Sequence, residues 1–302
     1  MILLFQSYLV YLALFLGTLV LTVYWRRRKR RSKLPFDPKI ERVRRLAGEG
    51  AREKCEELSE KIENDAIAAF FAPAAAIVSF SVSIAVFKPV GLMLEVLVWM
   101  VPLIGLVFLA FYVIRISRNI IQRSDWWLGQ FGERNVADHL EPLRHRGWWI
   151  YHDVPAENRG TKFNVDHVVV GPGGVFAVET KTPRRHEVKY GRQAEHVVEY
   201  DGEKLRWPNG FIDYDKPRRT AARADWLLKW MQAEKLPVKE VIPLLAIPWW
   251  YVRDVGKESC AVQAAHPGQL MGIIASRSAV LTANQIAVIA EKLDQHCCDV
   301  EF

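Results

Sequence analysis

The sequence has few of the residues that build small metal clusters or disulfide frameworks. Its 302 residues include four cysteines, and no two of them have the CxxC spacing: Cys55, Cys260, Cys297 and Cys298. This pattern argues against a zinc ribbon and against a disulfide-rich scaffold. The eight histidines are scattered, and no two have the HxxxH spacing of paired ligands on one helix. We therefore expect the histidines to be packed or solvated rather than bound to metal.

The C-terminal half also lacks an excess of positive charge. Residues 125–302 contain 23 Lys and Arg against 24 Asp and Glu, whereas residues 1–124 contain 18 against 10. The net charges are therefore −1 and +8, which sum to the +7 of the whole chain. A domain that binds nucleic acid tightly normally has a basic surface. The charge of the C-terminal half thus counts against strong non-specific binding of nucleic acid.

Long apolar runs are present only in the N-terminal part, at residues 2–25, 66–87 and 90–114. At about 1.5 Å per residue, each run is long enough to cross a bilayer core of about 30 Å. We predict a transmembrane anchor over residues 1–25 and a transmembrane helical hairpin over residues 66–115. Residues 26–65, rich in Arg, Lys and Glu, are predicted to be a basic and helical cytosolic linker with a solvated charged face.

Basic clusters predict how these spans are oriented. Arg26-Arg27-Arg28-Lys29-Arg30-Arg31 directly follows the first run, and Arg115, Arg118 and Arg123 follow the third. A cleaved signal peptide would have its basic residues before the apolar run, so we expect an uncleaved anchor. The excess of Lys and Arg on cytoplasmic loops predicts a multi-pass protein of a bacterial inner membrane, with the C-terminal domain in the cytosol. The alternative has two spans, with residues 2–25 lying in the membrane interface.

The C-terminal half has the pattern of an α/β domain. Apolar spacing predicts a helix that ends at Gly147, three strands, a second helix and a further buried strand, in the order α-β-β-β-α-β. These elements are expected at residues 126–145, 148–154, 163–170, 175–181, 218–233 and 242–248. A hairpin is also expected around Asp201-Gly202, and Thr282 to Gln285 matches a capping box before a C-terminal helix.

The most informative feature is the hairpin whose turn is Gly171-Pro172-Gly173-Gly174. If this turn pairs Val170 with Val175, then Asp166 lies opposite Glu179, with Cβ atoms roughly 5 Å apart. Lys181 points to the same face, two residues beyond Glu179. Opposed like charges destabilise a sheet, so something must compensate them. A divalent cation such as Mg²⁺ would do so. A structural salt bridge from Lys181 to both acids is the alternative.

These residues resemble a known family. Asp166 followed by Glu179-Thr180-Lys181 looks like the D…ExK signature of the PD-(D/E)xK nucleases. Gly129-Gln130-Phe131-Gly132-Glu133 is similar to the GxxGE motif on the first helix of the nuclease-related (NERD) domain, and VDHVVVGPGGVFAVETKT resembles the core of that domain. The resemblance covers roughly residues 125–250 of a domain that we place at residues 125–302.

The resemblance implies a restriction-endonuclease-like α-β-β-β-α-β core with C-terminal helices, preceded here by transmembrane helices. In that superfamily the Asp and the Glu bind Mg²⁺ or Mn²⁺, the Lys assists the attacking water, and an acidic residue of the first helix helps to bind the metal. The implied metal ligands are therefore Asp166, Glu179 and Glu133, and the implied catalytic set adds Lys181. Many members have a Gln on the helix after the sheet, but residues 217–220 contain none.

Two functions remain open at this stage. The first is a membrane-anchored nuclease that hydrolyses nucleic acid, expected to be DNA, at the cytosolic face of the membrane. The second is a non-catalytic module of the same fold that binds nucleic acid or a protein. Arg218, Arg219 and Arg223 are candidate phosphate contacts or a solvated basic face. The Trp pairs at 126–127, 148–149 and 249–250 are candidates for base stacking, but packing in the core or at the membrane interface is the preferred interpretation.

Overall fold

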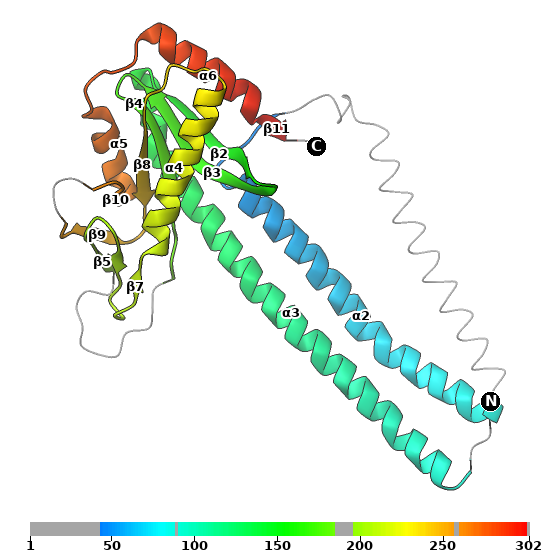
Figure 1. Cartoon of the computed structure of the whole chain (residues 1–302). Coiled ribbons are helices and arrows are strands. Elements are labelled where there is room, and N and C mark those ends of the chain that lie inside the picture. Colours follow the sequence, from blue (N-terminus) through cyan, green and yellow to red (C-terminus); the bar gives the residue numbers. More distant parts are fainter. Residues whose placement is uncertain (1–42, 88–89, 185–195, 257–259, 301–302) are drawn as a thin grey trace. The chain divides into compact units, whose positions relative to one another are not determined.

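The computed structural model describes residues 43–87, 90–184, 196–256 and 260–300. The anchor predicted over residues 1–25, and most of the basic segment after it, lie outside these ranges. The described part is a mixed α/β structure that contains a five-stranded and a four-stranded sheet (Figure 1).

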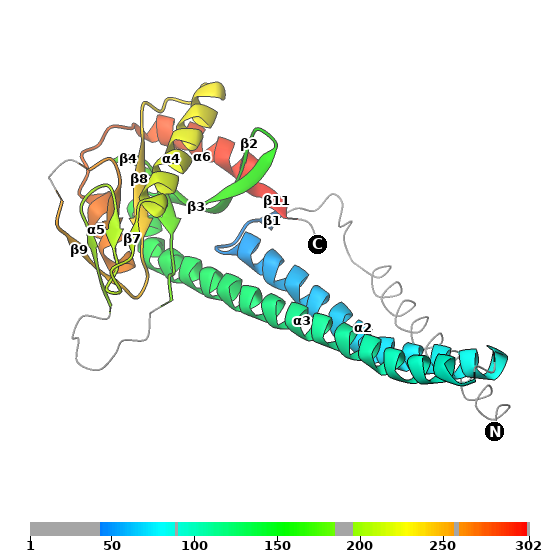
Figure 2. The same ribbon diagram turned by 60° about the horizontal axis from the view of Figure 1, so that its bottom comes forward.

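Two long helices contain the second and third apolar runs. α2 (Glu49–Phe87) and α3 (Leu92–Leu140) run side by side in both views of the chain (Figures 1 and 2). α3 continues without a break from the third apolar run into the helix predicted at residue 126. Within the described residues, one helical stretch is long and apolar enough to cross a membrane, Leu103–Arg146.

The predicted linker is helical from Glu49, but its charges do not all form a solvated face. Asp65 is 5% exposed. Its Oδ2 lies 2.9 Å from Arg115 Nε and accepts a hydrogen bond from Asn119 Nδ2 at 3.3 Å. Arg123 Nε also donates to Ser59 Oγ at 2.7 Å. The charged part of α2 is therefore joined to α3 by polar contacts, because these side chains face the neighbouring helix rather than water.

The five-stranded sheet contains the four strands predicted from the sequence, and three strands of a second sheet lie in the chain between its third strand and the helix that follows. Its first three strands form an antiparallel meander, and two further strands add in parallel beside the third, giving the spatial order β10-β8-β4-β3-β2. α4 (Asp215–Ala233) lies between β4 and β8 in the chain, which completes the α-β-β-β-α-β order. The strands are β2 (Trp149–Asn158), β3 (Thr161–Gly171), β4 (Gly174–Thr180), β8 (Val241–Ala246) and β10 (Gln263–Ala265).

Each face of this sheet is covered by helices, so the strands are rich in apolar residues on both faces. On one face, Val168 and Ala177 pack in a cluster with Leu227 of α4 and Leu293 of α6 (Ala283–Cys297). The other face packs against the end of α3, the 3-10 helix η1 (Glu141–Arg146) and α5 (Pro267–Ala275). Because both cores converge on β3 and β4, these two strands are rigid supports for the polar residues near their ends.

A second sheet was largely missed by the sequence patterns. Its order is β7-β6-β5-β9, and only the β5–β6 hairpin around Asp201 was predicted. Its strands are β5 (Val197–Tyr200), β6 (Leu205–Arg206), β7 (Ile212–Asp213) and β9 (Tyr251–Asp254). Trp250 is 2% exposed and packs edge-on against Trp207, with ring centroids 4.8 Å apart. Core packing is therefore confirmed for Trp250.

Predictions for helix ends are also confirmed. Gly147 closes η1 in the left-handed region at φ 81°, which favours glycine. At the start of α6, Gln285 N donates to Thr282 Oγ1 at 3.3 Å, and Thr282 N donates to Gln285 Oε1 at 2.9 Å. Separately, β1 (Val43–Arg44) and β11 (Cys298–Val300) form an antiparallel two-stranded pair.

Candidate active site

The hairpin register is the one that the turn predicted. Val170 pairs with Val175, and His167 pairs with Val178, so Asp166 and Glu179 are the next residues to face each other. Gly174 has φ 116°, which is in the region that favours glycine, and this conformation lets the short turn close. Thr180 N donates to Asp166 Oδ2 at 2.7 Å, and this bond fixes the Asp166 carboxylate beside the end of β4.

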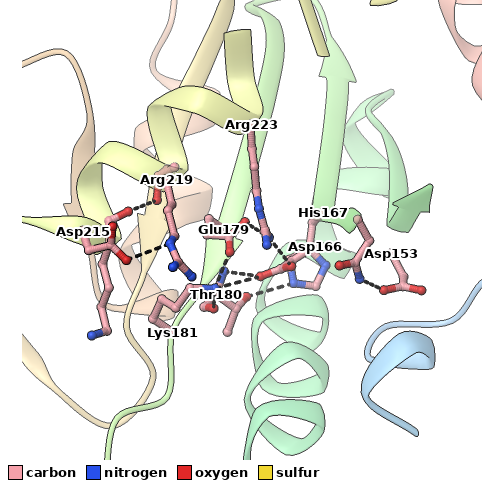
Figure 3. A network of polar contacts seen from close by, with 12 residues as sticks. Asp153, Asp166, His167, Glu179, Thr180, Lys181, Asp215, Arg219 and Arg223 are labelled. Carbon is pink, nitrogen blue, oxygen red and sulfur yellow. Dashed lines mark hydrogen bonds and ion pairs between the residues drawn. The ribbon is translucent and has the colours of Figure 1, made fainter. Parts of the chain in front are cut away.

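Both acids are buried, and each is paired with positive charge. Asp166 is 4% exposed and Glu179 is 1% exposed. Lys181 Nζ donates to Glu179 Oε1 and lies 3.9 Å from Asp166 Oδ2. Arg223 reaches across from α4, where its Nη1 donates to Glu179 Oε2 and, at 3.0 Å, to Asp166 Oδ1 (Figure 3). The contacts of the salt-bridge alternative are thus present, with Arg223 as a second cation.

The environment shifts the pKa values of this cluster. Burial raises the pKa of Glu179, and the nearby Asp166 charge raises it further, while Lys181 and Arg223 act in the opposite direction. Burial by itself lowers the pKa of Lys181, but the Glu179 and Asp166 carboxylates more than offset this, so its pKa is raised. Lys181 is therefore a protonated ammonium at neutral pH in this arrangement.

Glu133 lies close to these acids, as the GxxGE resemblance implied. It follows Gly132 on α3, and a Cβ at Gly132 would collide with Thr182 Cγ2, so glycine allows the helix to approach the end of β4. Burial, followed by the Asp166 and Asp153 charges, raises the pKa of Glu133 to about 9. Among the described residues, its buried Oε2 has no hydrogen-bond partner. Glu133 is therefore neutral at pH 7 and has an oxygen available for a ligand.

Asp153 is a further acid at this place, and the sequence analysis missed it. In the β2–β3 register, His152 pairs with His167 and Val154 with Val165, so Asp153 lies across from Asp166. Its backbone has φ 50°, which is unusual for a non-glycine residue. Counting back from the turn at Asn158–Thr161 places it there, but the sequence pattern alone does not identify this turn as the end of a hairpin.

The partner of Asp153 comes from the segment that precedes α2. Arg45 Nη1 donates to Asp153 Oδ2 at 2.6 Å, and Gly50 N donates to the same oxygen at 3.1 Å. Asn164 Nδ2 donates to Oδ1. Burial raises the pKa of Asp153 to about 6, although Arg45 opposes this. The start of α2 is thereby tied to the strand position beside Asp166.

Two histidines continue this polar network into the sheet. His152 Nδ1 and His167 Nδ1 are 2.9 Å apart, so one donates to the other, and His167 Nε2 lies 3.2 Å from Thr180 Oγ1. Burial lowers the pKa of His152 to about 4, and the Arg144 charge adds to this. Burial also lowers the pKa of His167 well below its usual value. Both rings are neutral at pH 7, which confirms that these histidines are packed within the sheet.

The three candidate phosphate contacts on α4 do not lie together. Arg223 is the one that reaches the acids. Arg218 and Arg219 both pair with Asp215, at 3.0 and 2.7 Å, and their side chains are 82% and 66% exposed. Arg218 and Arg219 are therefore exposed and paired with Asp215, while Arg223 contacts the two buried acids.

The donor chemistry of the site fits a divalent cation. Carboxylate oxygens are the ligands that Mg²⁺ and Mn²⁺ take in proteins, and Glu133 Oε2 is a buried acceptor without a partner among the described residues. In the ion-paired arrangement, however, the described residues contain no group of three or more His, Cys, Asp or Glu side chains set to hold a metal ion. A cation would therefore bind only where Arg223 releases the two carboxylates.

Comparison with protein families matches this part of the chain to a known domain. Residues 128–248 match the family profile described as nuclease-related domain (NERD). The matched region contains Glu133, Asp166, Glu179, Lys181 and Arg223. Searches of the curated proteins and of the solved structures give no match for the chain. Residues 128–248 of the chain are thus similar to a nuclease-related domain, and these five residues lie within the region of similarity.

Proposed function

We propose that this protein is a membrane-anchored, metal-dependent nuclease of the PD-(D/E)xK superfamily that hydrolyses phosphodiester bonds of nucleic acid, expected to be DNA. The observation that carries the proposal is the β3–β4 register. It brings Asp166, Glu179 and Lys181 to one sheet end, where Glu133 approaches from α3. The nuclease-related family match over the same residues supports it.

Asp166, Glu179 and Glu133 are the residues that would hold Mg²⁺ or Mn²⁺. Such a cation supplies Lewis-acid activation of water and stabilisation of the charge on the phosphoryl oxygens. The chain's own contribution is to hold these acids on rigid strands and on a helix that glycine brings close. Because the pKa of Glu133 is raised to about 9, cation binding would be accompanied by release of a proton near neutral pH.

Lys181 and Arg223 act as cations on the substrate side of the site. Since the pKa of Lys181 is raised, its ammonium holds a phosphate oxygen or orients a water molecule, and does not serve as the base. Arg223 neutralises the acids while no metal is bound. If a cation were held by the acids, the Arg223 guanidinium would be free to bind a phosphate oxygen in its fork geometry.

The membrane location rests on the apolar helices. The stretch Leu103–Arg146 is long and apolar enough to span, and none of its apolar window is buried by other described residues. Glu133 lies in the same helical stretch, beyond the apolar run that ends at Ile114. We propose a multi-pass protein of the bacterial inner membrane whose nuclease-related domain faces the cytosol, where its substrate is present.

A non-catalytic module is the competing function, and one observation favours it. Asp166 and Glu179 are already paired with Arg223 and Lys181, an arrangement that needs no metal. The net charge of −1 over residues 125–302 also makes tight binding to a polyanion less favourable. Under this function the cluster stabilises the fold and the protein binds a partner without cleaving it.

A cleavage assay separates the two functions. The full chain in detergent micelles is incubated with labelled DNA and RNA, with Mg²⁺, with Mn²⁺ or with EDTA. We expect cleavage that requires the cation, is lost in Asp166→Asn and Lys181→Ala, and persists in Arg218→Ala, which changes an exposed arginine of the same helix. Cleavage that persists in EDTA or in Asp166→Asn would assign the activity to a contaminant and contradict the proposal.

A further inference from the structure

Three aromatic rings, two of them exposed and one half-buried, form a stack beside Glu179 and Lys181. Trp127 and Phe131 lie one turn apart on α3, with ring centroids 5.7 Å apart and an angle of 11° between their planes. Trp249, which follows β8, continues the stack on Phe131 at 5.6 Å and 15°. Trp127 is 56% exposed and Phe131 is 52% exposed. We call these three residues the aromatic stack.

The third ring of the aromatic stack is held in place by an unusual backbone. Trp249 has φ 63°, a left-handed conformation that bulky residues rarely adopt. Such strain persists only where the surroundings impose it, and it is concentrated at functional sites. Here the neighbouring Trp250 supplies the anchor, because it is buried and its Nε1 donates to Pro183 O at 3.1 Å.

The segment from Lys181 to Arg184 connects the stack to the acids. Lys181 pairs with Glu179, and Thr182 packs against Gly132 of α3, beside Phe131. Arg184 then donates to Ser124 Oγ and to Asp125 Oδ1, both at 2.8 Å. Ser124 and Trp127 are neighbours on one helix face, since residues three apart lie side by side. The segment from Lys181 to Arg184 therefore leads from the acids to the aromatic stack, and it carries a cation at each end.

From this arrangement we propose that the aromatic stack binds the unpaired bases of a single-stranded polynucleotide whose backbone passes Lys181 and Arg184. This inference rests on the proposed function, and it names the form of the substrate. Single-stranded segments bind where aromatic faces accept bases and cations accept phosphates. A duplex presents no free base faces to such a stack. The Arg184–Asp125 ion pair has both side chains 56% exposed, so it is weak and can exchange for a phosphate.

The length of α3 argues against the membrane interface as the role of this stack. Trp127 lies 13 residues beyond Ile114, where the third apolar run ends, which is about 20 Å along a helix. The headgroup layer on each side of a bilayer is about 5–8 Å deep. Arg115, Arg118 and Arg123 also lie between that run and Trp127. The aromatic stack therefore projects past the lipid headgroups when α3 spans the membrane.

A binding measurement tests this inference without requiring catalysis. The full chain in detergent micelles, kept in EDTA, is titrated with a fluorescent 20-nucleotide oligo(dT). Trp249→Gly removes one ring and suits the positive φ, so the fold is expected to persist. Phe131→Leu removes the middle ring and keeps an apolar side chain. Each variant should weaken binding about tenfold, within a range of about 5- to 150-fold. Trp126→Ala, which changes the exposed neighbour outside the stack, should leave binding within about twofold.

An abasic oligomer of the same length separates stacking from charge. We expect it to bind the wild-type chain no more tightly than oligo(dT) binds Trp249→Gly, because the abasic oligomer lacks every base while the variant lacks one of the three rings. Equal binding of oligo(dT) by the wild type and by both stack variants would overturn the inference. Loss of association with anionic lipid vesicles in these variants, with unchanged binding of oligo(dT), would also overturn it and assign the rings to the membrane.

The outcome is distinguishable from a failure of the proposed function. If the chain cleaves nucleic acid with Mg²⁺ but the stack variants bind oligo(dT) normally, only the stacking inference fails. If the chain binds no oligonucleotide and cleaves none, both fail together. Preferential binding of a duplex over oligo(dT) would contradict the single-stranded form while leaving the nuclease function in place.

Discussion

Arg223 Nη1 of α4 lies 3.0 Å from Asp166 Oδ1 of β3, so a helix side chain neutralises a buried acid on the sheet. The same nitrogen donates to Glu179, the residue across the hairpin. This contact makes Arg223 the competitor of any cation at the site. The Asp166 and Glu179 carboxylates therefore bind either Arg223 or a metal ion, but not both at once.

Removing Arg223 should destabilise the metal-free protein and strengthen the effect of metal. Arg223→Ala leaves two buried acids with Lys181 as their cation among the contacts described, and breaking a buried ion pair costs about 3–5 kcal/mol. Unfolding in detergent with EDTA should show this loss, and Mg²⁺ should restore more stability than it adds to the wild type. Arg219→Ala, which changes an exposed pair on the same helix, should change stability by less than about 0.5 kcal/mol. Equal Mg²⁺ effects in wild type and Arg223→Ala would refute the competition.

A second prediction concerns the tie between α2 and the site. Arg45→Ala leaves Asp153 buried without its cation, so the free energy of unfolding should fall by about 3 kcal/mol at pH 8. The loss should shrink at pH 5, because the pKa of Asp153 is raised to about 6 and protonation removes the charge. Adding Asp153→Asn should recover part of the loss, which a double-mutant cycle would detect. Lys54→Ala, which removes an exposed i,i+3 pair, is the matched control.

The contacts of Arg45 and Gly50 with Asp153 predict that a chain without the start of α2 is less stable. A chain that starts at Asp125 loses Arg45 and Gly50, the two donors to Asp153 Oδ2, and keeps Asn164, the donor to Oδ1. Joining residues 43–66 to residues 114–302 by a short loop keeps them, and the Asp65–Arg115 contact at 2.9 Å brings the two ends together. The joined chain should melt at a higher temperature than the chain that starts at Asp125. Equal melting temperatures would show that the start of α2 contributes nothing to the domain.

The paired histidines predict a dependence of stability on pH. The pKa of His152 is lowered from its usual 6.5 to about 4, so the unfolded chain takes up its proton first as the pH falls. Stability from this residue is complete above pH 6.5 and declines by about 3 kcal/mol on the way to pH 4. Glu133, whose pKa is raised to about 9, has the opposite effect on the pH dependence. Its contribution to the free energy of unfolding is complete below pH 4.5 and is lost as the pH rises through 9.

Comparison of variants isolates the histidine. The free energy of unfolding between pH 6.5 and pH 4 should fall less steeply in His152→Gln than in the wild type. His145→Gln, which changes an exposed histidine of η1, should keep the wild-type slope. A His152→Gln profile parallel to that of the wild type would show that burial does not hold this ring neutral.

The membrane arrangement gives a topology prediction. Reporter fusions at Asp37 and at the C-terminus should both report the cytosol, and a fusion at Lys88 should report the opposite side, because basic residues flank the predicted spans on the inner face. A C-terminus outside the cytosol would contradict the nuclease function as well, since the domain would be separated from cytosolic nucleic acid.

The sequence predicted the relative positions of residues correctly where a short turn determines the pairing of two strands. The Gly171–Gly174 turn determined the register, and the register placed Asp166 opposite Glu179 without any tertiary knowledge. Arg223 was recognised as a cation near the site, but its contact with the acids depends on how α4 crosses the sheet, which local patterns do not encode. Arg45 lies 108 residues from Asp153, so its role could not be inferred from spacing.

The second sheet and the aromatic stack were missed for a related reason. β6 and β7 are two residues long each, too short for a periodic pattern to be detected. Trp249 and Phe131 come from distant parts of the chain and meet through a backbone conformation at φ 63° that no sequence pattern announces. The preferred interpretation of Trp249 was packing or the membrane interface, and its stacking on an exposed ring instead reflects this tertiary arrangement.

The most direct test of the account is the change in unfolding free energy that Mg²⁺ produces in the wild-type chain and in Asp166→Asn. If the buried acids form a metal site, Mg²⁺ at about 100 times its dissociation constant should stabilise the wild type by about 2.7 kcal/mol, and Asp166→Asn should show almost none of this gain. Lys181→Ala should keep most of the gain, because the lysine acts on water or phosphate rather than on the ion. No stabilisation of the wild type at any Mg²⁺ concentration, with Lys181→Ala the most destabilised variant, would contradict the metal site and leave a structural salt bridge in its place.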